Sequence, residues 1–136
     1  MASSSYFLDT NILISGVLWE GNERELLRLG RAGKVELSSS TYVLMEVQNT
    51  LSEMGHSLVE ILEFILHLRS ILRIDDPTMK EIEEYSNLLR DKSDLPVLAA
   101  VKTFGHILVT GDSGLRRKAA KHVDVRTTKE VLEEMD

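Results

Sequence analysis

The sequence predicts an α/β fold in which a central parallel sheet lies between two layers of helices. Short apolar runs typical of buried strands alternate along the chain with longer segments of helical periodicity. Parallel strands need crossover connections, and the helices in these connections cover both faces of the sheet. The length of 136 residues, of which 43% are hydrophobic, suits one core. We therefore expect a single domain over residues 1–136, a three-layer α/β/α sandwich with about five strands.

The expected elements follow one another in order from the N-terminus. The strand-like runs are residues 6–8, 35–37, 72–74, 106–110 and 123–125. Gly55 is expected to end the helix after the second run, and Ser57 with Glu60 has the capping-box pattern that opens the next helix. The same pattern precedes two later helices, at Thr78 with Glu81 and at Thr127 with Glu130.

The composition narrows the available chemistry. The chain has no cysteine, which excludes a disulfide framework, thiolate zinc sites and thiol catalysis. Its 16 basic and 22 acidic residues give a formal charge of −6, which argues against general binding of polyanions. Residues 1–5 lack the features of a signal peptide, and residues 58–74 carry too many charges for a membrane span. We therefore expect a cytoplasmic protein without a membrane partner.

Acidic residues follow two of the expected strands. Asp9 comes directly after residues 6–8, and Asp112 follows residues 106–110 after one glycine. The carboxyl ends of parallel strands meet at one edge of a sheet, where ligands bind in open α/β folds. Glu46, inside a helix, and Asp94, in the first turn of another, are candidates to join them. Such a cluster would repel itself unless divalent cations neutralised it, and its hard oxygen ligands suit Mg²⁺ or Mn²⁺.

Each of these acids also has an ordinary structural explanation. Aspartate is a favoured helix N-cap, so Asp9 and Asp112 could each cap the helix that follows a strand. Glu46 could lie on a solvated helix face, and Asp94 could be a first-turn acid favoured by the helix dipole. One acid alone therefore carries little functional information.

The order of the four acids and the residues around them resemble a known family. The matching segments are Leu8-Asp9-Thr10-Asn11-Ile12-Leu13-Ile14-Ser15-Gly16, Leu44-Met45-Glu46-Val47, Asp91-Lys92-Ser93-Asp94-Leu95-Pro96-Val97-Leu98-Ala99-Ala100 and Leu108-Val109-Thr110-Gly111-Asp112-Ser113-Gly114-Leu115. Together they span almost the whole chain, which resembles the PIN-domain nucleases, a family that includes the VapC-type toxins of toxin–antitoxin pairs.

The resemblance implies a PIN-like fold and a metal-dependent ribonuclease. It implies that Asp9, Glu46, Asp94 and Asp112 bind Mg²⁺ or Mn²⁺ and cleave single-stranded RNA. It assigns supporting roles around the acidic site to Asn11, Thr110 and Ser113, and Asp91 is close enough in sequence to support or replace Asp94. It also implies two kinds of protein partner, an antitoxin and further copies of the chain in a homodimer or higher homo-oligomer.

A basic segment follows Asp112. We expect Arg116, Arg117 and Lys121 to hold RNA phosphates beside the metal site, although a solvated helix face explains the same residues. Residues 61–74 contain more apolar side chains than one helix face buries, with Phe64 and Leu66 in excess, and this excess is typical of a subunit interface.

Two other interpretations of the sequence remain. A PIN-like scaffold could bind RNA or protein without cleaving it, and a phosphorylation receiver could use Asp75 or Asp76 as its phosphoacceptor. The receiver would need an acidic pair after the first strand, where Asp9 stands alone. A phosphatase with an Asp-x-Asp motif is disfavoured because the third position is Asn11. We expect Trp19, at the end of the first helix, in the core or at an interface.

Overall fold

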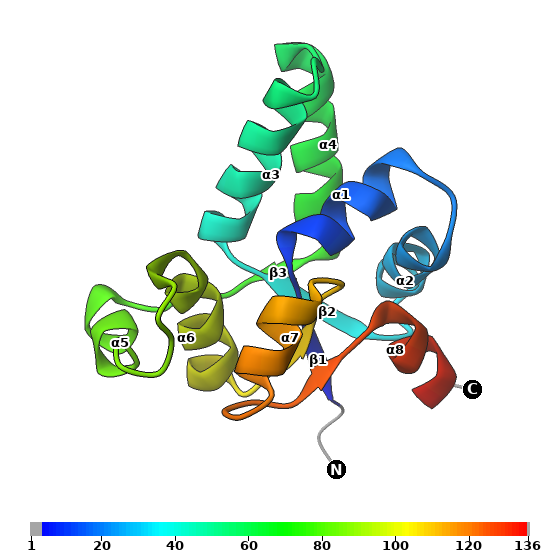
Figure 1. Cartoon of the computed structure of the whole chain (residues 1–136). Helices are drawn as coiled ribbons and strands as arrows, with labels where there is room; N and C mark the ends of the chain where they lie inside the picture. Colours follow the sequence, from blue (N-terminus) through cyan, green and yellow to red (C-terminus); the bar gives the residue numbers. More distant parts are fainter. Residues whose placement is uncertain (1–3, 136) are drawn as a thin grey trace.

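A computed structural model describes residues 4–135 and contains a five-stranded parallel sheet with helices on both faces (Figure 1). The strand order is β3-β2-β1-β4-β5, and every neighbouring pair is parallel. The strands are β1 (Ser5–Leu8), β2 (Glu36–Ser39), β3 (Arg73–Ile74), β4 (Ile107–Val109) and β5 (Val125–Arg126). The predicted three-layer α/β/α architecture is therefore confirmed.

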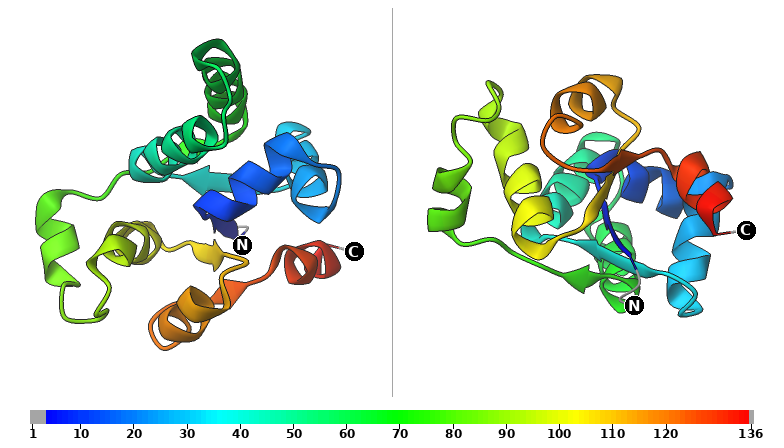
Figure 2. Two further views of the ribbon diagram at one scale, coloured as in Figure 1. Left: turned by 45° about the horizontal axis from the view of Figure 1, so that its top comes forward. Right: turned by 90° about the horizontal axis from the view of Figure 1, so that it is seen from below.

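The helices divide between the two faces of the sheet. One face is covered by α1 (Thr10–Leu18), α2 (Asn22–Arg31), α3 (Thr41–Glu53), α4 (Leu58–Ile71) and the C-terminal α8 (Thr128–Glu134). The other is covered by α6 (Leu95–Phe104) and α7 (Ser113–Ala119), with α5 (Met79–Glu84) beside α6 (Figure 2). A single 3₁₀ turn, η1 (Lys92–Asp94), leads into α6. From β1 the chain adds β2 and β3 on one side of the sheet and then β4 and β5 on the other, so the strand order reverses between β1 and β4. In such folds ligands bind at the carboxyl ends of the two strands where this reversal occurs.

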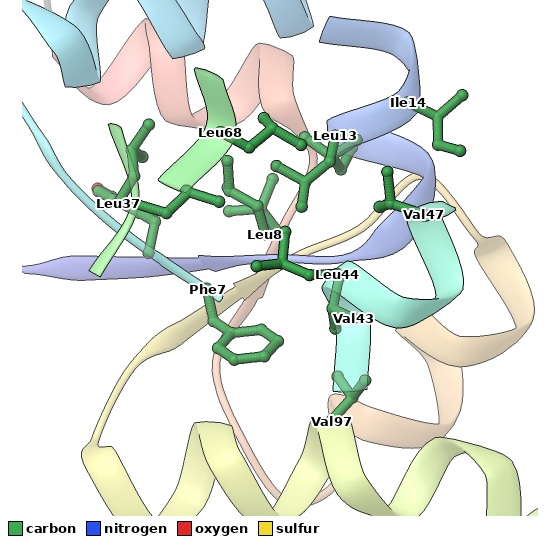
Figure 3. Close-up of a cluster of buried hydrophobic side chains, with 14 of the residues drawn as sticks. Phe7, Leu8, Leu13, Ile14, Leu37, Val43, Leu44, Val47, Leu68 and Val97 are labelled. Carbon is green, nitrogen blue, oxygen red and sulfur yellow. The ribbon is translucent and has the colours of Figure 1, made fainter. Parts of the chain in front are cut away.

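The central strand β1 is buried on both faces. Figure 3 shows Phe7 directed toward Val97 of α6, while Leu8 lies on the other side of the sheet near Leu13 and Leu68. Phe7 and Leu8 have no exposed surface. Successive side chains of a strand alternate between its faces, so an unbroken apolar run is what a strand covered on both sides requires.

Two strands lie one or two residues later than the sequence predicts. β2 extends past the apolar run to Ser38 and Ser39, whose buried hydroxyls donate to Asp75 Oδ2 at 2.8 Å and to the Leu8 carbonyl at 2.9 Å. These serines fit a buried strand because their polar atoms are paired. β5 begins at Val125, since Val123 still belongs to the turn after α7 and donates its amide to the Ala119 carbonyl.

The helix-end signals in the sequence are confirmed. All three predicted capping boxes form, before α4, α5 and α8. Gly55 follows the end of α3 with φ 94°, a left-handed conformation that glycine adopts without a Cβ penalty.

The expectation for Trp19 is half wrong. Trp19 is the C-cap of α1 and is 55% exposed, so it does not belong to the core. The interface alternative remains a prediction. Among residues 4–135, no helix combines the length and the apolar character that crossing a bilayer requires.

Candidate functional site

The candidate site lies at the carboxyl ends of β1 and β4, the two central strands. Leu8 pairs with Val109 at the end of both strands, and the Asp9 amide then donates to the Val109 carbonyl at 3.1 Å. Asp9 and Thr110 are therefore the first residues beyond the sheet on neighbouring strands. This register brings together two segments that are about 100 positions apart in sequence.

Asp9 is held by hydrogen bonds to both oxygens of its carboxylate. Oδ1 accepts the Thr10 amide at 2.8 Å, and Oδ2 accepts the Thr110 hydroxyl at 3.0 Å. The residue is only 8% exposed. Burial raises the pKa of Asp9 and outweighs these two hydrogen bonds, and the charge of Asp112 raises it further. Ionised Asp9 is thus fixed in position but poorly stabilised.

Thr110 connects Asp9 to Asp112. Its buried hydroxyl donates to Asp9 and accepts the Asp112 amide at 3.1 Å. Asp112 Oδ1 in turn accepts the amides of Gly114 at 2.8 Å and Leu115 at 3.2 Å, which makes Asp112 the N-cap of α7. Asp9 is likewise the N-cap of α1, although its Oδ1 accepts only the amide of the next residue, Thr10. The capping explanation therefore holds for both aspartates, but the caps also fix two carboxylates at one edge of the sheet.

Glu46 reaches this edge from α3. Its Oε1 accepts the Thr10 hydroxyl at 2.9 Å, so a residue next to Asp9 orients it. The half-buried position raises the pKa of Glu46, the charges of Asp9 and Asp94 add to this rise, and the Thr10 hydroxyl opposes it. Glu46 therefore belongs to the same electrostatic group as the two aspartates and is not on a fully solvated helix face.

Asp94 is the fourth member of this group. It lies at the end of η1, and its side chain makes no capping bond to α6. Burial raises the pKa of Asp94, and the charges of Asp91, Asp9 and Asp112 add to this rise. Asp91 is exposed and uses Oδ1 to accept the amide and hydroxyl of Ser93, which lowers its pKa. Asp91 therefore orders the turn, while the Asp94 side chain is left without such a bond.

The four carboxylates lack a basic counter-ion. Within residues 4–135, none of Asp9, Glu46, Asp94 and Asp112 forms an ion pair with lysine, arginine or histidine. In the same described part of the chain, no three acidic or histidine side chains already converge closely enough to share a metal ion. The chemistry of the donor set nevertheless fits a hard divalent cation, because several carboxylates at one sheet edge raise each other's pKa.

The supporting residues implied by the resemblance differ in their contacts. Thr110 is buried within the site, whereas Asn11 and Ser113 are exposed on the first turns of α1 and α7. Thr10, not Asn11, supplies the hydroxyl that binds Glu46. Thr10 was not among the candidates, although its hydroxyl stands directly beside Asp9 in the Asp-Thr-Asn motif.

Two further residues near the acids were also missed. Tyr42 lies one helical turn before Glu46 on α3, and the charges of Glu46, Asp94 and Asp91 raise its pKa after the larger effect of burial. Lys118 of α7 acts on Asp91 and Asp94, whose pKa values its charge lowers. The four-residue spacing of Tyr42 and Glu46 was a usable signal, since such residues share a helix face. The charge of Lys118 acts on η1 from another element of the fold, which no local pattern reveals.

The basic segment spreads around α7 and the turn after it. Arg116 is half-buried, and its charge lowers the pKa of Glu130 on α8. Arg117 and Lys121 are exposed. Among the basic residues of this segment, Lys118 is the one whose charge acts on Asp91 and Asp94.

A second polar cluster is centred on Asp75, which follows β3, and on His106, which precedes β4. Asp75, 5% exposed, accepts the Ser38 hydroxyl at 2.8 Å and His106 Nε2 at 2.7 Å on Oδ2, and Arg73 Nε at 3.0 Å on Oδ1. His106 Nδ1 is also within hydrogen-bonding distance of the Ser5 hydroxyl. Asp75 is thus buried and both of its carboxylate oxygens accept hydrogen bonds, whereas the phosphoacceptor of a receiver must be exposed.

The fold and the acidic edge define a doubly wound α/β domain whose candidate site lies beyond its two central strands. Residues 6–121 match the family model of the PIN domain, and the chain belongs to the PIN domain family. No curated protein matches the chain by sequence.

Solved structures show the same fold at low sequence identity. VapBC2 from Rickettsia felis, solved bound to a DNA fragment from their promoter, has a TM-score of 0.73 and 19% identity, covering 90% of this chain and 98% of that chain. PAE2754 from Pyrobaculum aerophilum has a TM-score of 0.71 and 16% identity, covering 98% of each chain. FitAcB from Neisseria gonorrhoeae has a TM-score of 0.63 and 19% identity, covering 91% and 98%.

Proposed function

We propose that this chain is a divalent-cation-dependent endoribonuclease that cleaves single-stranded RNA. Membership of the PIN domain family supports nuclease chemistry. The observation that carries the proposal is the group of four carboxylates, partly or largely withdrawn from water at Asp9, Glu46 and Asp94, with no basic side chain paired to any of them in the described residues. Withdrawing unpaired charges from water is costly, and a bound cation removes that cost.

Asp9, Glu46, Asp94 and Asp112 are the residues that would hold Mg²⁺ or Mn²⁺. Such a cation lowers the pKa of a bound water and stabilises the oxygens of an in-line phosphoryl displacement. The protein contributes rigidity: Thr110 fixes Asp9 and the Asp112 backbone, and Thr10 fixes Glu46. These hydrogen bonds restrict the carboxylates of Asp9 and Glu46 before a cation binds, and the cation would draw the four acids together.

The RNA would approach across α7. Lys118 stands near Asp91 and Asp94, and Arg117 and Lys121 are exposed on the same segment, so phosphates bound there would lie next to the acids. With a formal charge of −6, the protein would depend on this local patch for its affinity. Arg116 would contribute less, because it is half-buried.

Two protein partners complete the proposal. We propose that the chain is the toxin of a toxin–antitoxin pair, because VapBC2 and FitAcB share its fold, as does VapBC-1 from nontypeable Haemophilus influenzae. We also propose a homodimer through α4, where Leu58, Leu62 and Leu66 recur every four residues and remain 76%, 55% and 58% exposed. Such an apolar stripe is self-complementary across a two-fold axis. Phe64, by contrast, packs against the core and is not available for an interface.

Cleavage of an unstructured RNA by the purified chain tests the proposed function. We expect product with Mn²⁺ or Mg²⁺, none with EDTA, and at least a hundred-fold loss in Asp94→Asn, taking about 3 kcal/mol for one preorganised charged group. Glu53→Gln, which removes an exposed carboxylate elsewhere on α3, is the matched control and should keep full activity. RNA binding with no cleavage under any metal condition would favour the non-catalytic binding module.

A further inference from the structure

The turn that carries Asp94 leads directly into α6 but makes few hydrogen bonds to distant parts of the chain. Within η1, Asp91 caps the Ser93 amide, and the Asp94 amide donates to the Asp91 carbonyl at 3.2 Å. Lys92 reaches back to the Ser86 carbonyl at 2.7 Å. All of these bonds are local, so they order the turn but do not fix its distance from Asp9 and Glu46.

One hydrogen bond connects this turn to a distant element. The Tyr42 hydroxyl of α3 donates to the Ser93 carbonyl at 3.0 Å, across 51 positions of sequence. Among residues 4–135, it is the only hydrogen bond that joins residues 91–94 to a part of the chain more than six positions away. Tyr42 is half-buried and its ring packs against the core, which restricts the position of its hydroxyl.

The same helix holds the neighbouring acid. Glu46 follows Tyr42 by one helical turn and accepts the hydroxyl of Thr10, the residue next to Asp9. Hydrogen bonds thus run from Asp9 and Thr10 to α3, and from α3 to the Ser93 carbonyl beside Asp94. Helix α3 is therefore hydrogen-bonded both to Thr10, next to Asp9, and to Ser93, next to Asp94.

We propose that Tyr42 is a positioning residue that tethers the Asp94 turn to α3 and so keeps Asp94 beside Glu46 and Asp9. The inference rests on the proposed function, because it assigns Tyr42 a role in assembling the proposed metal site. The tether opposes electrostatic repulsion between the acids. Like charges separated by a short distance repel, and the turn brings its two acids close to the other three. The positive charge of Lys118 offsets part of this repulsion at Asp94.

Tyr42→Phe keeps the ring and removes the bond to the Ser93 carbonyl, together with the lesser interaction of the hydroxyl with Glu46, so amide exchange at the turn is the readout specific to the tether. Loss of one net hydrogen bond corresponds to about a five-fold change in an equilibrium. In the metal-free protein we expect the amides of Ser93, Asp94 and Leu95 to exchange with solvent about five-fold faster. Apparent affinity for Mn²⁺, measured by calorimetry, should fall about five-fold, and saturating Mn²⁺ should restore most of the RNA cleavage.

Tyr6→Phe is the matched control. The Tyr6 hydroxyl donates to Glu134 at 3.2 Å, and the residue lies on β1 with its partner on α8, so the variant loses a comparable bond away from η1. It should leave both the exchange at residues 93–95 and the Mn²⁺ affinity unchanged. Parallel melting curves show whether either variant has lost general stability.

The result that overturns the proposal is wild-type exchange at residues 93–95 in Tyr42→Phe. Faster exchange with unchanged Mn²⁺ affinity would also overturn it, since the tether would then have no role at the site. If the wild type itself binds no Mn²⁺, the proposed function fails and the positioning role fails with it, whereas the exchange comparison still reports on the tether as a structural contact.

Discussion

At the scale of single residues, Asp9 combines burial with a charge that lacks a basic partner. Burial, and then the charge of Asp112, raises its pKa in the folded protein. A carboxyl group with a raised folded pKa contributes stability that is present below its unfolded pKa of about 3.9 and is lost as the pH rises through the folded value. Ionisation of Asp9 should therefore reduce the stability of the metal-free protein as the pH rises above about 4.

Asp9→Asn tests this cost. The amide keeps the size and the capping oxygen but removes the charge. We expect a rise of about 3 °C in the metal-free melting temperature at pH 7, corresponding to about 1 kcal/mol for a domain of this size, and a flatter dependence on pH. A lower melting temperature at pH 7, with the same pH dependence as the wild type, would mean that ionised Asp9 does not destabilise the fold.

Asp75 presents the opposite case. Burial alone would raise its pKa, but hydrogen bonds from Ser38, His106 and Arg73 outweigh that effect and lower the pKa. Its contribution to stability is therefore present above an unfolded pKa of about 3.9 and is lost as the pH falls through the folded value.

Asp75→Asn should lower stability by roughly 2 kcal/mol at pH 7, because hydrogen bonds to a buried charge are lost. Denaturant unfolding at pH 7 and pH 3 measures the effect, and the gap from the wild type should narrow at pH 3. Glu53→Gln, on an exposed carboxylate, should change neither value noticeably. An equal gap at both pH values would remove the charge of Asp75 from the explanation.

At the scale of secondary-structure elements, α7 joins an acidic cap to a basic end. Asp112 caps its first turn, and Arg116, Arg117 and Lys118 lie in its last. Neutralising Arg116 and Arg117 together with glutamine should weaken RNA binding and reduce the slope of log affinity against log salt by up to about 1.4, at roughly 0.7 for each phosphate contact. Arg117→Gln alone should reduce the slope by about 0.7, the share of one phosphate contact.

The salt titration needs a control with the same change in net charge. Lys34→Gln with Lys80→Gln removes two exposed charges on other parts of the surface and should leave the slope unchanged. If both double variants lower the slope equally, the effect is one of overall charge, and the α7 segment is an ordinary solvated face.

Helix α4 carries the proposed contact between subunits. Leu62→Glu places a charge in the exposed stripe formed with Leu58 and Leu66 and should convert a dimer to a monomer. Light scattering coupled to gel filtration measures the mass. Met79→Glu, at an exposed apolar position on α5, should not change it. A wild type that is already monomeric at high concentration would contradict the α4 interface.

At the scale of the whole molecule, the elements that the sequence predicted correctly have local causes. The capping boxes and Gly55 depend on residues within four positions of each other. The strand at residues 6–8 is an unbroken apolar run, which a central strand buried on both faces requires. β2 was placed too early because Ser38 and Ser39 do not look like strand residues until their partners, Asp75 and Leu8, are known.

The residues of the candidate site also divide into those that the local sequence predicts and those that depend on tertiary contacts. Asp9 and Asp112 were visible as residues after strands, and the structure places them at the ends of adjacent strands. Glu46 and Asp94 follow no strand, and only the resemblance to the PIN-domain nucleases assigned them to the site. Tyr42 and Lys118 act on the acids through contacts between elements, and no local pattern contains those contacts. Trp19 was misjudged because its type favours burial, whereas its position at the end of α1 lies on the surface.

The central claim is that Asp9, Glu46, Asp94 and Asp112 together hold a divalent cation. The most direct measurement is the shift in melting temperature on adding Mn²⁺ to the metal-free protein, compared between the wild type and Asp112→Asn. A ligand at a hundred times its dissociation constant adds about 2.7 kcal/mol, which corresponds to roughly 8 °C here. We expect that shift in the wild type and in Glu53→Gln, and less than half of it in Asp112→Asn. Equal shifts in wild type and Asp112→Asn, or no shift in the wild type, would contradict a cation site at the edge of the sheet.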